Sequence, residues 1–216
     1  MRRRPLALAL AVATLAAAPA VVSAALSEVG NASPEAVASC PARPCLAFSR
    51  TTGFQAKVGE RRGTHIIPRD GRIVAWTISL GKPGKKQQEF FESKLGGPAS
   101  AQITVLEPRD NLRFSAVAQG EPRRLEKYFG TTVQFPLRRS IPVKKGQTIG
   151  LTTDTWAPAL AVGLGGDTSW RAARGKGKCE DPETQTAQTT ANQISQYYCL
   201  YRTARLTYSV TLVSTP

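Results

Sequence analysis

Residues 72–80 read RIVAWTISL, and the hydropathy of this stretch alternates from one position to the next. A period of two residues is typical of a β-strand that buries one face and exposes the other. The expected buried face carries Val74, Trp76, Ile78 and Leu80, and the opposite face carries Ala75, Thr77 and Ser79. We therefore predict a half-buried strand over these residues, with Trp76 in the core.

The same alternation recurs along the rest of the chain. Runs of this kind occupy residues 101–106, 112–119, 131–137, 141–143, 147–151 and 198–212. In the last and longest run Arg202 interrupts the apolar face, which predicts one central strand with a bulge near that residue. Many short strands joined by turns rich in Gly and Pro predict a single jelly-roll-like β-sandwich over residues 40–216.

Two segments depart from this strand pattern. Residues 85–95, KKQQEFFESKL, are mainly helix formers between Gly84 and Gly96-Gly97, so we predict one short helix there. Phe90, Phe91 and Leu95 would pack this helix against a sheet edge. Residues 172–194 are nearly all polar, and they predict a long surface loop. The expected fold class is therefore all-β with one short helix.

The first 24 residues have the features of a secretory signal peptide. Three arginines at positions 2–4 precede the apolar stretch Leu6–Ala18, and Val22-Ser23-Ala24 fits a cleavage site before Ala25. A membrane-anchoring helix is the alternative, because the longer apolar stretch from Leu6 to Leu26 is about long enough to span a bilayer. Residues 25–39 are small and polar, which predicts a flexible lead-in. No later segment is long and apolar enough to cross a bilayer, so we expect a secreted or envelope-associated protein.

The four cysteines allow three disulfide connectivities. Export would place them in an oxidising compartment, where disulfides form and persist. We favour Cys40–Cys45 and Cys179–Cys199, because each pair closes a local segment. The second bridge would tether the loop of residues 172–194. A zinc site, the alternative, would require more closely spaced cysteines or additional histidines.

The composition favours anionic neighbours and excludes several mechanisms. Lys and Arg number 29 against 15 Asp and Glu, and removal of the three leader arginines leaves 26 − 15 = +11. This charge fits an envelope polysaccharide or an anionic surface polymer, whereas export makes nucleic acid an unexpected partner. His65 is the single histidine, so a multi-histidine metal site is excluded, and His65 is expected to be structural or at the surface. We find no catalytic constellation and no motif for a metal or cofactor.

Residues beside two tryptophans are the candidates for ligand binding. Trp156 lies between Asp154 and Pro158, a context typical of a loop, and Trp170 precedes Arg171, so both indoles could be exposed or could equally cap the ends of the core. Exposed aromatic rings can stack on sugars, while Asp154 and Arg171 could hydrogen-bond to hydroxyl groups. A glycan platform at these four residues is therefore the first hypothesis.

Two further readings of the polar residues remain open. A secreted hydrolase with unrecognised catalytic carboxylates would use a pair among Asp154, Asp167 and Glu107, held roughly 5–10 Å apart. A basic cluster could instead bind a polyanion or be a solvated part of the loop. That cluster consists of Arg171, Arg174, Lys176 and Lys178.

Several motifs together resemble a group of secreted actinobacterial proteins of unknown function. They are residues 76–80 (WTISL), 90–91 (FF), 96–98 (GGP), 103–106 (ITVL), 128–130 (YFG), 141–147 (IPVKKGQ), 155–158 (TWAP) and 199–208 (CLYRTARLTY). The resemblance covers most of the chain after the signal peptide. It implies export and a β-sandwich-like fold, and it implies no activity and no site residue.

Overall fold

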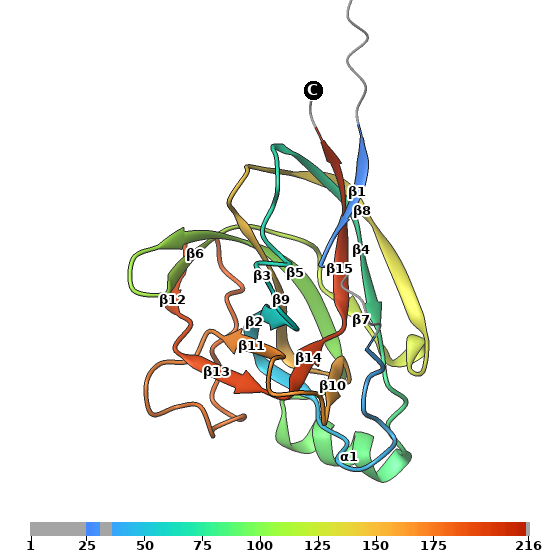
Figure 1. Ribbon diagram of the computed structural model, residues 1–216. Coiled ribbons are helices and arrows are strands. Elements are labelled where there is room, and N and C mark those ends of the chain that lie inside the picture. The colour runs from blue at the N-terminus through green and yellow to red at the C-terminus, as the bar shows by residue number, and fades with distance from the viewer. Residues whose placement is uncertain (1–24, 31–35, 215–216) are drawn as a thin grey trace, which may run out of the picture.

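The computed structural model describes residues 25–30 and 36–214 (Figure 1). Within them the fold is all-β, with a single α-helix, as the sequence predicts. The elements are β1 (Leu26–Val29), β2 (Phe48–Val58), β3 (Arg61–Arg62), β4 (Gly71–Ser79), α1 (Lys85–Lys94), β5 (Ser100–Arg109), β6 (Arg113–Gln119), β7 (Arg123–Arg124), the 3₁₀ helix η1 (Glu126–Tyr128), β8 (Thr132–Val143), β9 (Thr148–Ala157), β10 (Leu160–Val162), β11 (Ser169–Ala172), β12 (Ile194–Gln196), β13 (Cys199–Arg202), β14 (Ala204–Leu206) and β15 (Tyr208–Ser214).

Two curled antiparallel sheets face each other across one main core. The smaller sheet has the strand order β1-β15-β4-β8, and the larger has the order β12-β6-β5-β9-β2-β11-β13, with β3 on β2 and β7 on β5. Figure 1 shows the smaller sheet standing along one side of the larger. Trp76 and Val210 from the smaller sheet meet Ile103 and Leu151 from the larger in the core. The architecture is therefore a sandwich-like fold whose layers share one hydrophobic interior.

The strand over 72–80 is present, but a bulge changes the face of its first residues. The pairing of β4 with β8 shifts register between Ile73 and Ala75. A bulge adds one residue on its strand and so reverses the alternation across it. Ile73 is consequently buried and Val74 only half-buried, which corrects the expected inward position of Val74. Trp76 is fully buried, as predicted.

The C-terminal run is three strands, so the prediction of one central strand is wrong. β13 belongs to the larger sheet, β14 pairs only with β10, and β15 lies inside the smaller sheet. Thr203 has a φ of +56°, a left-handed conformation that ends β13 one residue after Arg202. The alternation of hydropathy continues through these breaks, because each short strand still buries one face.

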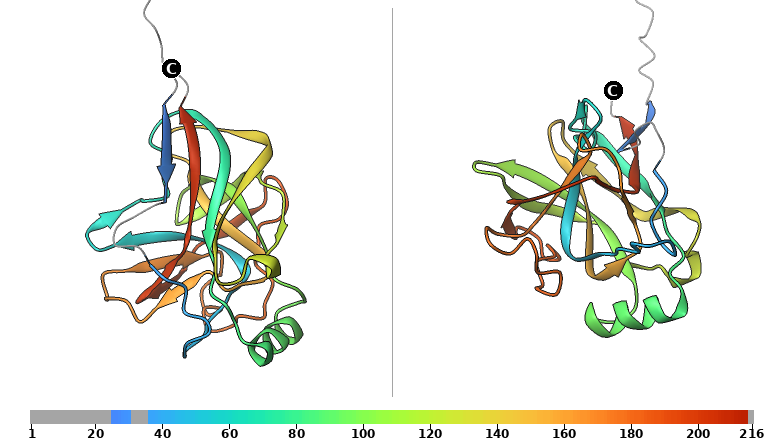
Figure 2. Two further views of the ribbon diagram at one scale, coloured as in Figure 1. Left: turned by 90° about the vertical axis from the view of Figure 1, so that its right-hand side faces the viewer. Right: turned by 60° about the horizontal axis from the view of Figure 1, so that its bottom comes forward.

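The helix occupies Lys85–Lys94, as predicted, and lies at the end of the molecule away from β1 (Figure 2). Its first turn is stabilised by Gln87, whose side-chain oxygen accepts a hydrogen bond of 2.7 Å from the Gly84 N–H. Phe91 and Leu95 are buried against the sandwich, whereas Phe90 is largely exposed. The helix therefore covers one end of the core through two of the three expected apolar residues.

The expected lead-in includes a strand. Leu26–Val29 forms β1 and pairs antiparallel with β15, and Val29 is buried. The Glu28 carboxylate accepts hydrogen bonds from the hydroxyl groups of Ser209 and Thr211 on β15. These contacts explain why a short polar stretch is ordered as an edge strand. The predicted signal peptide, residues 1–24, lies outside the described residues, and the described part contains no helix that could span a membrane.

Candidate functional site

Both candidate tryptophans are core residues. Trp156 lies in β9 with no exposed surface, packs between Phe91 and Phe129, and donates a hydrogen bond of 2.9 Å to the carbonyl oxygen of Gly97. Trp170 lies in β11, 5% exposed, and stacks on Tyr201 with 4.4 Å between ring centroids. A sugar-stacking platform needs an exposed ring face. The alternative in which these two rings are exposed is therefore wrong.

Arg171 and Asp154 are exposed enough to contact a ligand but lie apart. The Arg171 guanidinium donates to the carbonyl oxygens of Tyr197 at 3.0 Å and Tyr198 at 3.2 Å. Asp154 is an exposed residue of β9, and β2 separates β9 from the strand that carries Arg171. The four residues of the predicted glycan platform are thus not brought together, and Asp154 is the one that lines a hollow.

The three carboxylates of the hydrolase hypothesis are also dispersed. Asp154 accepts a hydrogen bond from Ser100 at the start of β5, whereas Glu107 near the end of β5 accepts one from Gln147. Seven residues of strand separate Ser100 from Glu107, which is roughly 23 Å at 3.3 Å per residue. Asp167 lies elsewhere, beside the turn at Gly59 that follows β2. None of these three acids is therefore paired with another across one cleft.

Two adjoining hollows meet at Asp154, and a third continues from them toward β8. The first, of about 410 Å³, is lined by Asp154 together with residues that include Ser100, Gln102, Gln119, Glu121 and Thr189. The second, of about 300 Å³, shares Asp154 and Ser100 and is bounded by Pro98, Arg123 and Arg124. The third, of about 280 Å³, shares residues 119–121 with the first and reaches Arg138 and Arg139. We call these three hollows together the Asp154 groove.

Strand pairing places the polar groups of the groove. The Ser100 hydroxyl donates to the Asp154 carboxylate at 2.8 Å and lies 3.1 Å from the Thr155 hydroxyl. Beneath them, the hydroxyl groups of Thr104 and Thr152 are 2.6 Å apart and those of Thr52 and Thr152 are 2.8 Å apart. Of these threonines Thr152 lines the groove, so a network of buried hydroxyl groups supports the groove floor, with Asp154 at its rim.

The groove is rich in arginine on both sides of Asp154. Glu121 lies between two guanidinium groups, at 2.6 Å from Arg138 and 3.6 Å from Arg123. Arg124 pairs with Glu126 at 3.7 Å. The Arg123 guanidinium also lies over the Phe135 ring at 6.0 Å from its centroid. With Arg139, four arginines accompany Asp154, Glu121 and Glu126, so the charge along the groove is net positive.

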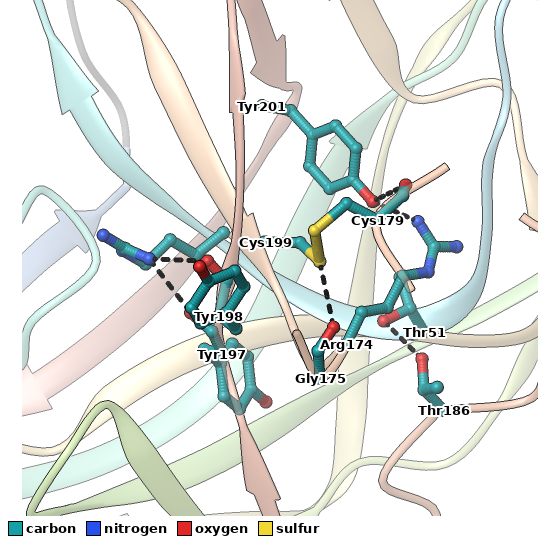
Figure 3. The surroundings of a disulfide bond; sticks show 10 residues. Thr51, Arg174, Gly175, Cys179, Thr186, Tyr197, Tyr198, Cys199 and Tyr201 are labelled. Atoms are coloured by element: carbon teal, nitrogen blue, oxygen red, sulfur yellow. Dashed lines mark hydrogen bonds between the residues drawn. A yellow bond between two sulfur atoms is a disulfide. The ribbon is translucent and has the colours of Figure 1, made fainter. Parts of the chain in front are cut away.

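The loop of residues 172–194 closes one side of the larger sheet, and a disulfide and a buried arginine hold it (Figure 3). Cys179–Cys199 and Cys40–Cys45 are both bonded, which confirms the predicted pairing. Arg174 is 4% exposed and donates to the Ser49 carbonyl at 2.8 Å and the Tyr201 hydroxyl at 2.7 Å. Arg174 therefore holds the loop in place, and this member of the predicted basic cluster is not accessible to solvent.

Gln188 fixes the remainder of the loop to the sheet. Its side chain is fully buried and donates to the carbonyl oxygens of Phe114 at 3.1 Å and Gln193 at 2.6 Å. Its amide oxygen accepts a hydrogen bond from the Tyr197 hydroxyl at 2.5 Å. Because the neighbouring Thr189 lines the groove, these bonds also set the position of that groove wall.

His65 is a buried structural residue. Its Nε2 donates to the Tyr208 carbonyl oxygen at 3.3 Å, and its Nδ1 lies 3.1 Å from the Thr64 hydroxyl. The pKa of His65 is lowered from 6.5 to about 4. Burial is the main cause, the hydrogen bond to Tyr208 opposes it, and the positive charge of Arg205 adds to it. In the part of the chain that the structure describes, no group of three or more His, Cys, Asp or Glu side chains could hold a metal ion.

Asp154 was predicted from the sequence, whereas its partners in the groove were not. Ser100, Gln119 and Glu121 carry no local motif, and they reach Asp154 only through the pairing of β5 with β9 and β6. The adjacent pairs Arg123-Arg124 and Arg138-Arg139 were the local signals of the positive charge. Comparison with known proteins adds no assignment, because the chain matches no family model, no curated protein and no solved structure.

Proposed function

We propose that this protein is an exported, non-catalytic β-sandwich of the cell envelope that binds a polysaccharide in the Asp154 groove. The observation that carries the proposal is the arrangement of three adjoining hollows whose mixed lining includes hydroxyl, amide and charged groups in each hollow or its neighbour. Sugars present both hydroxyl groups and apolar ring faces, so an elongated groove of mixed lining matches a polysaccharide better than it matches a compact apolar ligand.

Asp154 is the central binding residue of this proposal. Its carboxylate lines two of the hollows and accepts a hydrogen bond from the Ser100 hydroxyl at 2.8 Å. An ionised carboxylate has capacity for about four hydrogen bonds, so Asp154 can also accept from ligand hydroxyl groups. Two disulfides support export, because such bonds persist mainly in oxidising compartments.

Co-sedimentation with insoluble peptidoglycan and titration with soluble neutral polysaccharides would test this function. Asp154→Asn should weaken the binding about tenfold, since a hydrogen bond to a charged group contributes about 1.5–3 kcal/mol. Asp167→Asn is the matched control, because Asp167 is another exposed acid and lies outside the groove. Equal binding by the two variants would contradict the proposal, as would the absence of binding to every polysaccharide tested.

A further inference from the structure

The Asp154 groove carries its aspartate between two pairs of arginines, and this arrangement bears on its ligand. Asp154 lines two of the hollows, Arg123 and Arg124 line one of these with it, and Arg138 and Arg139 line the third hollow. An anionic group on the ligand would be repelled near Asp154 and attracted near the arginines. The groove is therefore suited to a ligand that carries both hydroxyl and anionic groups.

Carboxylates hold the arginines of the groove in place without neutralising their charge. Glu121 accepts from the Arg138 Nε at 2.6 Å and also pairs with Arg123 Nη2 at 3.6 Å, so one acid is shared by two cations. Arg124 has Glu126 as its partner, and no carboxylate of the described residues pairs with Arg139. The local excess of positive charge remains available to a bound anion.

The geometry of these side chains also favours specific binding over diffuse attraction. Glu121 uses the Nε of Arg138, so the two terminal nitrogens of that guanidinium remain for another acceptor. The Arg138 and Arg124 side chains are 77% and 67% exposed. Guanidinium groups held in this way bind carboxylates and phosphates through paired hydrogen bonds, and a fixed fork loses less entropy than a free lysine would.

We infer that the ligand is an acidic polysaccharide, and that Arg124 and Arg138 bind its carboxylate or phosphate groups while Asp154 binds its hydroxyl groups. This inference rests on the proposed function, because it names the class of polymer that the same groove takes. The shared chemistry is an oxyanion on a chain rich in hydroxyl groups. A uronic acid polymer and a polyol phosphate polymer are its two sources.

Isothermal titration with polygalacturonate, its fully methyl-esterified form and poly(glycerol phosphate) would test this inference. Esterification removes the charge and retains the sugar chain, so we expect wild-type protein to bind polygalacturonate or poly(glycerol phosphate) at least tenfold more tightly than the ester. The double variant R124Q/R138Q should lose that preference and bind the ester as wild-type protein does. The tighter of the two acidic polymers then identifies the source of the anion.

The double variant R61Q/R62Q is the matched control, because it removes the same charge from exposed arginines of β3 that do not line the groove. We expect it to change binding of the acidic polymers less than twofold, and thermal unfolding would verify that both variants fold. Equal losses in the two double variants would overturn the inference, because binding would then follow net charge alone. Equal binding of the ester and the acidic polymers would overturn it too, yet leave the proposed function standing, whereas no binding to any polymer would overturn both.

Discussion

Acidification should destabilise this protein through His65, the single histidine of the chain. The folded protein holds the imidazole in its neutral form, because the ring is 1% exposed and donates to the Tyr208 carbonyl oxygen. Its pKa is about 4 in the folded state, against an ordinary value of 6.5. Gly30 packs closely against the ring, since a Cβ at that position would lie 2.5 Å from the His65 Nε2.

The sign of the effect follows from the direction of the pKa shift. The unfolded chain takes up a proton near pH 6.5, whereas the folded chain does so only near pH 4, so acid favours the unfolded state between these values. Stability attributable to His65 is fully present above pH 6.5 and is lost as the pH falls toward 4. The pKa of His65 shifts from 6.5 to about 4 on folding, and each pKa unit corresponds to about 1.4 kcal/mol. The total loss in the free energy of unfolding is therefore about 3 kcal/mol.

Urea unfolding at pH 7.5 and pH 5 would measure this loss before most carboxylates titrate. We expect the free energy of unfolding to fall by about 2 kcal/mol between these values, and the His65→Gln variant to lack that part of the dependence. An NMR titration of the one imidazole would give the folded-state pKa directly. A midpoint of 6 or above in the folded protein, or equal stability of the wild-type protein at the two pH values, would refute the reasoning.

Three further predictions concern the loop and the core. Gln188→Leu should lower the free energy of unfolding by about 2–4 kcal/mol in urea, because it removes the hydrogen bond of the buried Tyr197 hydroxyl and those to the carbonyl oxygens of Phe114 and Gln193; a loss below 0.5 kcal/mol would contradict this role. Replacing Cys179 and Cys199 by serine should lower the free energy of unfolding by about 3 kcal/mol, and the same change at Cys40 and Cys45 by about 2 kcal/mol, because a bridge that closes a longer loop restricts the unfolded chain more. A larger loss at Cys40 and Cys45 would argue against this entropic explanation. Trp156→Ala should cost about 3–5 kcal/mol by calorimetry, and ligand binding per folded molecule should stay unchanged if the indole has only a packing role.

Features that depend on neighbours in sequence were predictable. Alternating hydropathy located the strand around Trp76, and flanking glycines located the helix at Lys85–Lys94. Both disulfides follow from the closure of short segments. The breaks between β13, β14 and β15 were not predictable from hydropathy, because the same alternation continues across them while the strands change sheets.

The candidate site was predictable only in part, because burial depends on distant partners. Trp156 stands between Asp154 and Pro158, which is a context typical of a loop, yet Phe91 covers its ring from a helix 65 positions earlier. Asp154 is exposed, as expected for a ligand-binding acid, but its groove is built by Ser100 and residues 119–121 from other strands. Sequence patterns report which face of a strand is apolar, and they do not report which remote segment lies on it.

The position of β15 between β1 and β4 has a consequence for biogenesis. In a chain of this topology β1 cannot join the smaller sheet until the ribosome has released residues 208–214, because β1 pairs with β15 and not directly with β4. Contacts between such distant parts of a chain also make folding slow. The edge of the smaller sheet is therefore completed only after every strand of the larger sheet has been synthesised.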